Sequence, residues 1–409
     1  MASFSFGAGN AGKLLRIPLY VLGRIATALI PRSRDEWVFG CAVGIADGAL
    51  ALWRRAEAEG TRAVWLVDDG QAAAARDRGI RTVTRHSVRG FWRTARARVI
   101  VVTHGFGDVN RYAATGGVVV QLWHGIPLKR IGLDAPVTTH SPVPFARAFL
   151  ASSYRRTQAR IRVLPAASQL VRGRLESAFG LPSSCVPVTG DPRVDVLSAG
   201  TPAERRASAR AGLAGALGED IGDRRVVLYA PTWRDGAPDP AAPTPEQWRL
   251  LLDVLRRHDA VLAIRSHPLG RGEYAPPVAT DRVRALGSDL VADVTPLLPA
   301  MDVLVTDYSS LAYDAGLVPL PTVYLAPDIE DYARSRGFYG TYRDVAGDDP
   351  ARDWRDAAAQ LDAVWSDPAE HARRRAAAEV LSLRVHAFRD GRNTDRVYRA
   401  ITARLRGDT

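Results

Sequence analysis

The chain has 409 residues, with 46% hydrophobic and 24% charged side chains, which is ordinary for a soluble globular protein and long enough for two domains. Its net charge of +11 favours acidic partners: nucleic acid, anionic lipid, or substrates rich in phosphate. The two cysteines, Cys41 and Cys185, lie far apart in sequence. This excludes a disulfide framework and fits a reducing, cytoplasmic compartment.

A basic apolar segment lies near the start of the chain. Residues 13–34 contain five basic side chains and no acidic one. Their longest uncharged apolar stretch, residues 17–23, is far shorter than the roughly 20 residues needed to cross a bilayer, and no signal-peptide cleavage pattern follows. Two interpretations remain open: a basic amphipathic segment that lies on an anionic membrane surface, or a helix that packs on the adjoining domain.

Strand-like runs alternate with helix-like runs along the chain, which is typical of parallel α/β sheets. The first half predicts strands at residues 36–40, 63–67, 99–103, 118–122, 163–166 and 186–189, with helices at 47–59 and 169–179. The second half predicts strands at residues 226–230, 261–266, 303–306 and 322–325, with helices at 245–258 and 310–317. Residues 197–223, rich in Ala, Gly and Arg, separate the two sets.

This pattern predicts an α/β protein of GT-B architecture, in which two Rossmann-like domains face a central cleft. We expect a basic N-terminal segment (1–34), a first Rossmann-like domain (35–197) and a second one with C-terminal helices (198–409). Ligands in such a layout bind at the carboxyl ends of the strands. No G-x-G-x-x-G fingerprint or P-loop follows an early strand, which argues against a nicotinamide-dependent enzyme or an ATPase.

The strand predicted at residues 118–122 leads directly into Trp123, His124 and Gly125. A histidine at the carboxyl end of a buried strand can exchange a proton near neutral pH, so His124 is a candidate general base. Gly125 permits close approach of a ligand, and Lys129 adds a cation in a chain that has only one other lysine. The alternative is that His124 is a core histidine with a satisfied hydrogen bond.

A strand end in the second half predicts a phosphate site. Residues 302–310 lead from a strand through Asp307 to Ser309 and Ser310, where a helix is expected to begin. The first backbone N–H groups of a helix and its positive end favour bound phosphate. Plain helix capping by the two serines is the alternative interpretation.

Two more strand ends carry basic residues. Arg265 and His267 end one strand, where they could face a bound phosphate or belong to a structural loop. Arg234 follows another strand and could pair with phosphate. The acidic loop at residues 328–332 is interpreted as solvated surface. Because no D-x-D motif stands at a strand end, we predict neither a metal nor a cofactor.

Five motifs stand in one order: residues 121–129 (QLWHGIPLK), 189–195 (TGDPRVD), 229–235 (YAPTWRD), 265–268 (RSHP) and 305–314 (VTDYSSLAYD). Together they resemble the CDP-glycerol:poly(glycerophosphate) glycerophosphotransferase family, the teichoic acid primases and polymerases. The resemblance implies a GT-B fold and the transfer of glycerol phosphate from CDP-glycerol to a hydroxyl of a lipid-linked or polyol-phosphate acceptor, with release of CMP and without metal. It also implies a peripheral enzyme on the cytoplasmic face of the membrane.

The resemblance further implies a role for particular residues. His124 matches a histidine proposed to act as base, and His267 matches a second histidine of the family; these two are the predicted catalytic residues. Asp307, Ser309 and Ser310 match the segment that holds the pyrophosphate. The residues predicted to bind substrate are Gly125, Lys129, Arg234, Asp235, Arg265, Asp307, Ser309 and Ser310.

Three other functions stay open at this point. They are a GT-B glycosyltransferase that uses a nucleotide sugar, a ribitol phosphate transferase that uses CDP-ribitol, and a basic nucleic-acid-binding protein. The arginine-rich run at residues 76–98 is the best support for nucleic-acid binding, but it has few interleaved aromatic residues and no nucleic-acid motif. We therefore predict no nucleic-acid partner.

Overall fold

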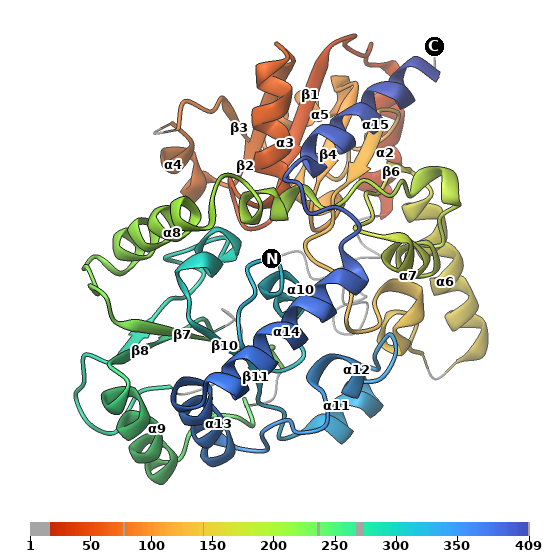
Figure 1. Ribbon diagram of the computed structural model, residues 1–409. Coiled ribbons are helices and arrows are strands. Elements are labelled where there is room, and N and C mark those ends of the chain that lie inside the picture. The colour runs from red at the N-terminus through yellow and green to blue at the C-terminus, as the bar shows by residue number, and fades with distance from the viewer. Residues whose placement is uncertain (1–16, 77, 142, 235–237, 267–273, 408–409) are drawn as a thin grey trace. The chain divides into compact units, whose positions relative to one another are not determined.

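The computed structural model describes residues 17–76, 78–141, 143–234, 238–266 and 274–407. The chain divides into two compact units (Figure 1). The first unit contains the chain up to Gly125, residues 130–195, and the residues from Asp390 onward. The second unit contains the short segment Ile126–Lys129 together with Val196–Arg389. The chain therefore enters the second unit twice and leaves it twice.

The first unit is built on a parallel sheet of six strands in the order β3-β2-β1-β4-β5-β6. The strands are β1 (Glu36–Gly40), β2 (Arg62–Val67), β3 (Thr82–Thr84), β4 (Val99–Val102), β5 (Val118–Gln121) and β6 (Ile161–Val163). The central strands are continuous runs of Val, Ile and aromatic residues, as expected for a sheet that is covered on both faces. The order reverses between β1 and β4, which makes that sheet edge the topological switch point.

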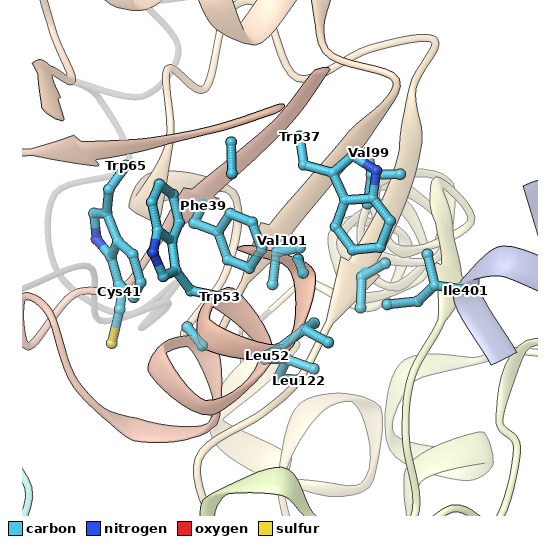
Figure 2. Close-up of a cluster of buried hydrophobic side chains, with 14 of the residues drawn as sticks. Trp37, Phe39, Cys41, Leu52, Trp53, Trp65, Val99, Val101, Leu122 and Ile401 are labelled. Carbon is cyan, nitrogen blue, oxygen red and sulfur yellow. The ribbon is translucent and has the colours of Figure 1, made fainter. Parts of the chain in front are cut away.

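Aromatic side chains fill one face of this first sheet (Figure 2). Phe39 lies against Trp65 and Trp53, with ring centroids 5.8 Å and 5.1 Å apart. Trp53 comes from α3 (Asp47–Ala58), and Ile401, from α15 (Asn393–Gly407), joins the same cluster. A helix more than 300 residues away in sequence thus completes this core, and it packs beside α3 (Figure 1).

The remaining helices of the first unit follow the strands or flank them. They are α2 (Ile17–Leu29), α4 (Ala72–Arg76), α5 (Val88–Arg96), α6 (Pro144–Gln158) and α7 (Gln169–Phe179). In α2, Gly23 and Thr27 are buried against the body of the unit, whereas Leu22, Ile25 and Leu29 are largely exposed. The segment is thus both a packed helix and an amphipathic surface. Within the described residues, no helix is both long and apolar enough to span a membrane.

The second unit is a parallel sheet of five strands in the order β11-β10-β7-β8-β9. The strands are β7 (Arg225–Ala230), β8 (Ala260–Ile264), β9 (Val283–Ala285), β10 (Val303–Thr306) and β11 (Thr322–Tyr324). The helices are α8 (Pro202–Leu217), α9 (Pro245–Arg257), α10 (Leu311–Ala315), α11 (Ile329–Ser335), α12 (Arg343–Ala346), α13 (Trp354–Ser366) and α14 (Pro368–Val385). The order reverses between β7 and β10, so the switch point of this sheet lies where these two strands end.

Several predicted elements need correction. The C-terminal helix α15 belongs to the first unit and not to the second, because Val397 and Ile401 are buried in the first core. Residues 186–189 form no strand: Val188 makes a single bridge with Ala166. Pro187 lacks the N–H that would continue a ladder. The sequence interpretation did not include the strands β3 and β9.

Candidate active site

The end of β5 delivers His124 through a strained turn. Trp123 has a φ of 64°, a left-handed conformation that non-glycine residues seldom adopt, and Gly125 has a φ of 143°. The Trp123 ring packs edge-on against Phe179 at 5.2 Å, which holds the turn from the side. Backbone strain of this kind is found at functional sites more often than elsewhere. The His124 side chain is exposed, so it is not the core histidine of the alternative interpretation.

The ring of His124 is oriented by a carbonyl at the end of the neighbouring strand. Its Nδ1 lies 3.5 Å from the Thr103 carbonyl oxygen, which also accepts a hydrogen bond of 2.7 Å from Gln121 Nε2. A carbonyl oxygen can only accept, so this contact places the proton on Nδ1 and leaves the lone pair on Nε2. That tautomer is the one a general base needs.

His104, which the sequence interpretation missed, lies against His124. It follows β4 as His124 follows β5, and the two imidazole rings are parallel within 7° with centroids 4.3 Å apart. Burial lowers the pKa of His104, although the charge of Asp108 opposes this. A signal was present in the sequence, because Thr103-His104-Gly105 repeats the strand-His-Gly pattern of the next strand. Gly105 also has a positive φ, 141°.

In the second unit, Asp307 joins the ends of the two central strands. Its Oδ1 accepts hydrogen bonds from the backbone N–H of Thr232, at 2.8 Å, and of Tyr308, at 2.6 Å. Its Oδ2 accepts a bond of 2.9 Å from Arg234 Nη1. Thr232 follows β7 and Asp307 follows β10, so this buried carboxylate lies at the switch point of the second sheet.

Arg234 is held almost entirely by protein oxygens. Its Nε and Nη2 both donate to Asp328, each at 2.8 Å, in addition to the bond to Asp307. Burial by itself would lower the pKa of Arg234, but the hydrogen bonds to Asp328 and the charge of Asp307 raise it. A direct contact between Arg234 and phosphate stays a prediction, and the geometry favours a role in shaping the site. Asp328 is not part of a solvated acidic loop, since it also accepts a bond of 2.9 Å from Tyr308.

The two serines lie at the start of α10, but only one of them accepts a hydrogen bond from a backbone N–H of the helix. Ser309 Oγ accepts a hydrogen bond of 3.2 Å from Leu311 N. Ser310 occupies the N-cap position with no side-chain cap bond. Both serines are half-buried. Arg265, after β8, donates to the carbonyl oxygens of Val291, at 2.7 Å, and Ala292, at 3.2 Å, and therefore braces a loop.

Lys129 lies in the second unit although it is five residues from His124 in sequence. Its backbone forms an antiparallel bridge with Phe338, and its Nζ lies 6.0 Å from the centre of the Tyr332 ring. Burial lowers its pKa to about 8, and the positive charge of Arg336 acts in the same direction, while Asp307 opposes. Arg336, also half-buried, is a second cation that the sequence interpretation missed. Two half-buried cations beside each other favour a bound anion.

Two predicted residues, Asp235 and His267, lie outside the described residues. Within the described part of the chain, no group of three or more His, Cys, Asp or Glu side chains is arranged to hold a metal ion. The structure thus separates the described site residues by unit: the first unit carries His124 and Gly125, and the second carries the others. The first group can move a proton, and the second can bind a phosphate group.

The chain has two Rossmann-like units, each with its candidate site residues at the carboxyl ends of parallel strands. This is the architecture of a GT-B protein, which confirms the predicted fold class. The particular family follows from the sequence over nearly its whole length. The chain belongs to the CDP-glycerol:poly(glycerophosphate) glycerophosphotransferase family, which matches residues 37–403. This confirms the family predicted from the five motifs, and with it the class of enzyme, a glycerophosphotransferase.

Relatives and a solved structure agree with this placement. The teichoic acid glycerol-phosphate transferase of Staphylococcus aureus is 26% identical over 288 residues, which cover 68% of this chain and 70% of that protein. The teichoic acid poly(glycerol phosphate) polymerase of Staphylococcus epidermidis is 29% identical over 234 residues, which cover 54% of this chain but 30% of the polymerase. The structure of the wall teichoic acid polymerase TagF matches 95% of this chain and 94% of its own, with a TM-score of 0.76 and 20% identity. The chain thus spans less than a third of the polymerase from S. epidermidis.

Proposed function

We propose that this protein transfers glycerol phosphate from CDP-glycerol to a hydroxyl of a lipid-linked or polyol-phosphate acceptor in the synthesis of teichoic acid or a related cell-surface polymer, and releases CMP. The family match over residues 37–403 is the observation that carries the proposal. The half-buried Lys129 and Arg336, which favour an anion in the second unit, support a phosphate-bearing donor.

The proposed reaction is a displacement at phosphorus. The acceptor oxygen forms a bond to the β-phosphorus of CDP-glycerol, and the bond from that phosphorus to the oxygen bridging to the α-phosphorus breaks. The bond's electrons leave with CMP. His124 Nε2 takes the proton of the acceptor hydroxyl, a contribution of roughly 10²- to 10⁴-fold for a general base. Charge on the transferred group is stabilised by positioned cations and backbone N–H groups, which do most of the work in phosphoryl transfer.

In this proposal each residue of the second unit has a distinct task. Lys129 contacts the pyrophosphate directly, and Ser309 and Ser310 offer it hydrogen bonds. Asp307 fixes the ends of β7 and β10 by its bonds to Thr232 and Arg234, and Ser309 and Ser310 follow the second of these strands. Arg234 is held in turn by Asp328. His267 is assigned a contact with the transferred phosphate because the sequence predicts it at the end of a strand.

The experiment that tests the function is mass analysis of products made from CDP-glycerol and a short lipid-linked acceptor. We expect CMP and an acceptor that has gained one or more glycerol phosphate units. Parallel reactions with CDP-ribitol and with UDP-sugars separate this function from the two other transferases left open by the sequence. Turnover of a UDP-sugar, with none of CDP-glycerol, would contradict the proposal. We also expect activity to persist in excess chelator, whereas activity restored by magnesium would contradict a metal-free reaction.

The partner surface and location are also part of the proposal. We infer that the enzyme is peripheral on the cytoplasmic face of an anionic membrane, where a lipid-linked acceptor would be held. The exposed apolar side chains of α2, together with Arg24 on the same helix, support this. Leu22, Ile25 and Leu29 are 62%, 56% and 80% exposed, respectively, which is more than a helix that only packs on its domain requires.

A further inference from the structure

The two histidines that follow adjacent strands differ in burial and in the length of their contacts with Thr103. His124 is exposed, and its contact with the Thr103 carbonyl is long, at 3.5 Å. A hydrogen bond of that length orients a ring weakly. His104 is half-buried, and its Nδ1 lies 2.7 Å from Thr103 Oγ1. The half-buried His104 ring therefore lies face to face with the exposed His124 ring, which also packs against Trp123 at 4.2 Å.

Asp108 is the anchor of this arrangement. Its buried Oδ2 accepts hydrogen bonds from the backbone N–H groups of Thr103, at 2.9 Å, His104, at 2.7 Å, and Gly105, at 3.3 Å. The same oxygen lies 3.3 Å from Thr103 Oγ1. One carboxylate thus fixes the backbone that carries the His104 ring, and it also fixes the residue whose carbonyl and hydroxyl contact the two imidazoles.

We propose that His104 is a positioning residue for the transfer reaction, which holds the His124 ring flat against its own face so that Nε2 of His124 points at the acceptor hydroxyl. This inference rests on the proposed function, in which His124 is the base. The geometry that carries it is the parallel stack at 4.3 Å and 7°, together with the anchoring of His104 by Thr103 and Asp108. His104 itself exchanges no proton with substrate in this proposal.

The chemistry of the pair suits such a role. A neutral ring beside His124 lets that residue gain a proton during the reaction without a second positive charge at 4.3 Å. The ordering of an exposed side chain before reaction removes a rotational freedom that would otherwise be lost at the transition state. An arginine or lysine in place of His104 could not do this, because its charge would oppose protonation of His124.

The test distinguishes a contribution of the flat face of the His104 ring from a contribution of its nitrogen atoms. His104→Phe keeps a flat ring, while His104→Asn keeps a polar group near Thr103 but has no ring. We expect His104→Phe to retain kcat within about threefold. We expect His104→Asn and His104→Ala to lose roughly 10- to 100-fold in kcat with little change in the KM for CDP-glycerol, the scale of a misplacement of about 1 Å. His371→Ala, at a half-buried histidine of α14, is the matched control and should leave kcat unchanged.

A second measurement does not depend on turnover. Nitrogen-15 spectra of labelled histidines, assigned through a His124→Asn variant, report which nitrogen of His124 carries the proton. We expect one tautomer, protonated on Nδ1, in the intact protein and in His104→Phe, and a mixture in His104→Ala. An unchanged spectrum and kcat in a folded His104→Ala protein would overturn the inference. Loss in His104→Phe equal to that in His104→Ala would also overturn it, because the nitrogens would then be what matters. If the intact protein transfers nothing, the proposed function fails while the spectra still decide how His124 is held.

Discussion

The ends of the central strands carry opposite kinds of chemistry in the two units. In the first unit, His124 is exposed, its Nδ1 lies 3.5 Å from the Thr103 carbonyl oxygen, and its ring packs between those of His104 and Trp123. In the second unit, Asp307 and Arg234 are buried and form an ion pair, and Arg234 also donates to Asp328. A side chain that reacts with substrate must be accessible, while charged groups that shape a site can be buried and bonded to one another. Exposure therefore separates the candidate base from the supporting charges.

The largest effect on activity is expected for substitution of His124. His124→Asn removes the proton acceptor but keeps a side chain of similar polarity, so we expect kcat to fall by about 10³-fold, within the range for loss of a general base. The release of CMP from CDP-glycerol measures it. Because the His124 side chain is exposed, the free energy of unfolding should hardly change. A folded variant with near-normal turnover would remove His124 from the reaction.

For the buried carboxylate of Asp307, we expect a large loss of stability on substitution. Asp307→Asn leaves the Arg234 guanidinium short of a charge partner in a site where the two side chains are 4% and 8% exposed. Breaking a buried pair in this way costs about 3–5 kcal/mol, so denaturant unfolding should show a clear loss of stability. Asp331→Asn, in a pair with Arg334 that is more than two-thirds exposed, is the control and should cost less than about 1 kcal/mol. Equal stability of the two variants would contradict a structural role for the buried pair of Asp307 and Arg234.

Lys129 is intermediate between the two kinds of group. Because its pKa is lowered to about 8, chiefly by burial, its positive charge is present below that pH and is lost as the pH rises through it. We expect kcat/KM for CDP-glycerol to fall on the order of tenfold above pH 8, about 1.4 kcal/mol. Lys129→Arg should shift this loss to higher pH, since arginine stays charged. A profile in which Lys129→Met keeps the same alkaline fall would assign that fall to another group.

The smallest effect concerns the surface of the first unit. Arg24→Ser on α2 should weaken binding to anionic vesicles by about 1 kcal/mol, roughly fivefold, without a change in transfer to a soluble acceptor. Arg334→Ser, at an exposed arginine of the second unit, is the matched control and should bind as the intact protein does. Deletion of residues 1–29 should remove most binding while keeping Arg32, which donates to the Ala97 carbonyl. Full cosedimentation of that truncated protein would contradict a membrane role for α2.

Much of the fold follows from local sequence signals. The strand at Glu36–Gly40 and the helix at Gln169–Phe179 have the predicted bounds, because an apolar run and a serine N-cap mark them. The placement of α15 could not be predicted in this way. The apolar pattern of this helix does not indicate which of the two cores it joins. Only the folded structure shows that Val397 and Ile401 pack in the first core.

The site was predictable to a similar degree. Strand ends identified His124, Asp307 and the serines, since the carboxyl edge of a parallel sheet is where ligands bind. The partners of those residues were missed, because they come together only in the fold. The acidic sequence around Asp328 predicts solvated surface, yet Asp328 binds Arg234, which is 94 residues away in sequence. The stacking of His104 on His124 likewise depends on the pairing of β4 with β5.

The return of α15 to the first core constrains how the protein can fold during synthesis. Val397 and Ile401 are fully buried there, but they are translated more than 230 residues after the last strand of the first sheet, which ends at Val163. At roughly 5–20 residues per second, the first unit waits about 12–47 seconds with its aromatic face incompletely covered. The second unit, which is encoded in that interval, is expected to fold first. The order of folding on the ribosome is thereby the reverse of the order in which the two sheets are encoded.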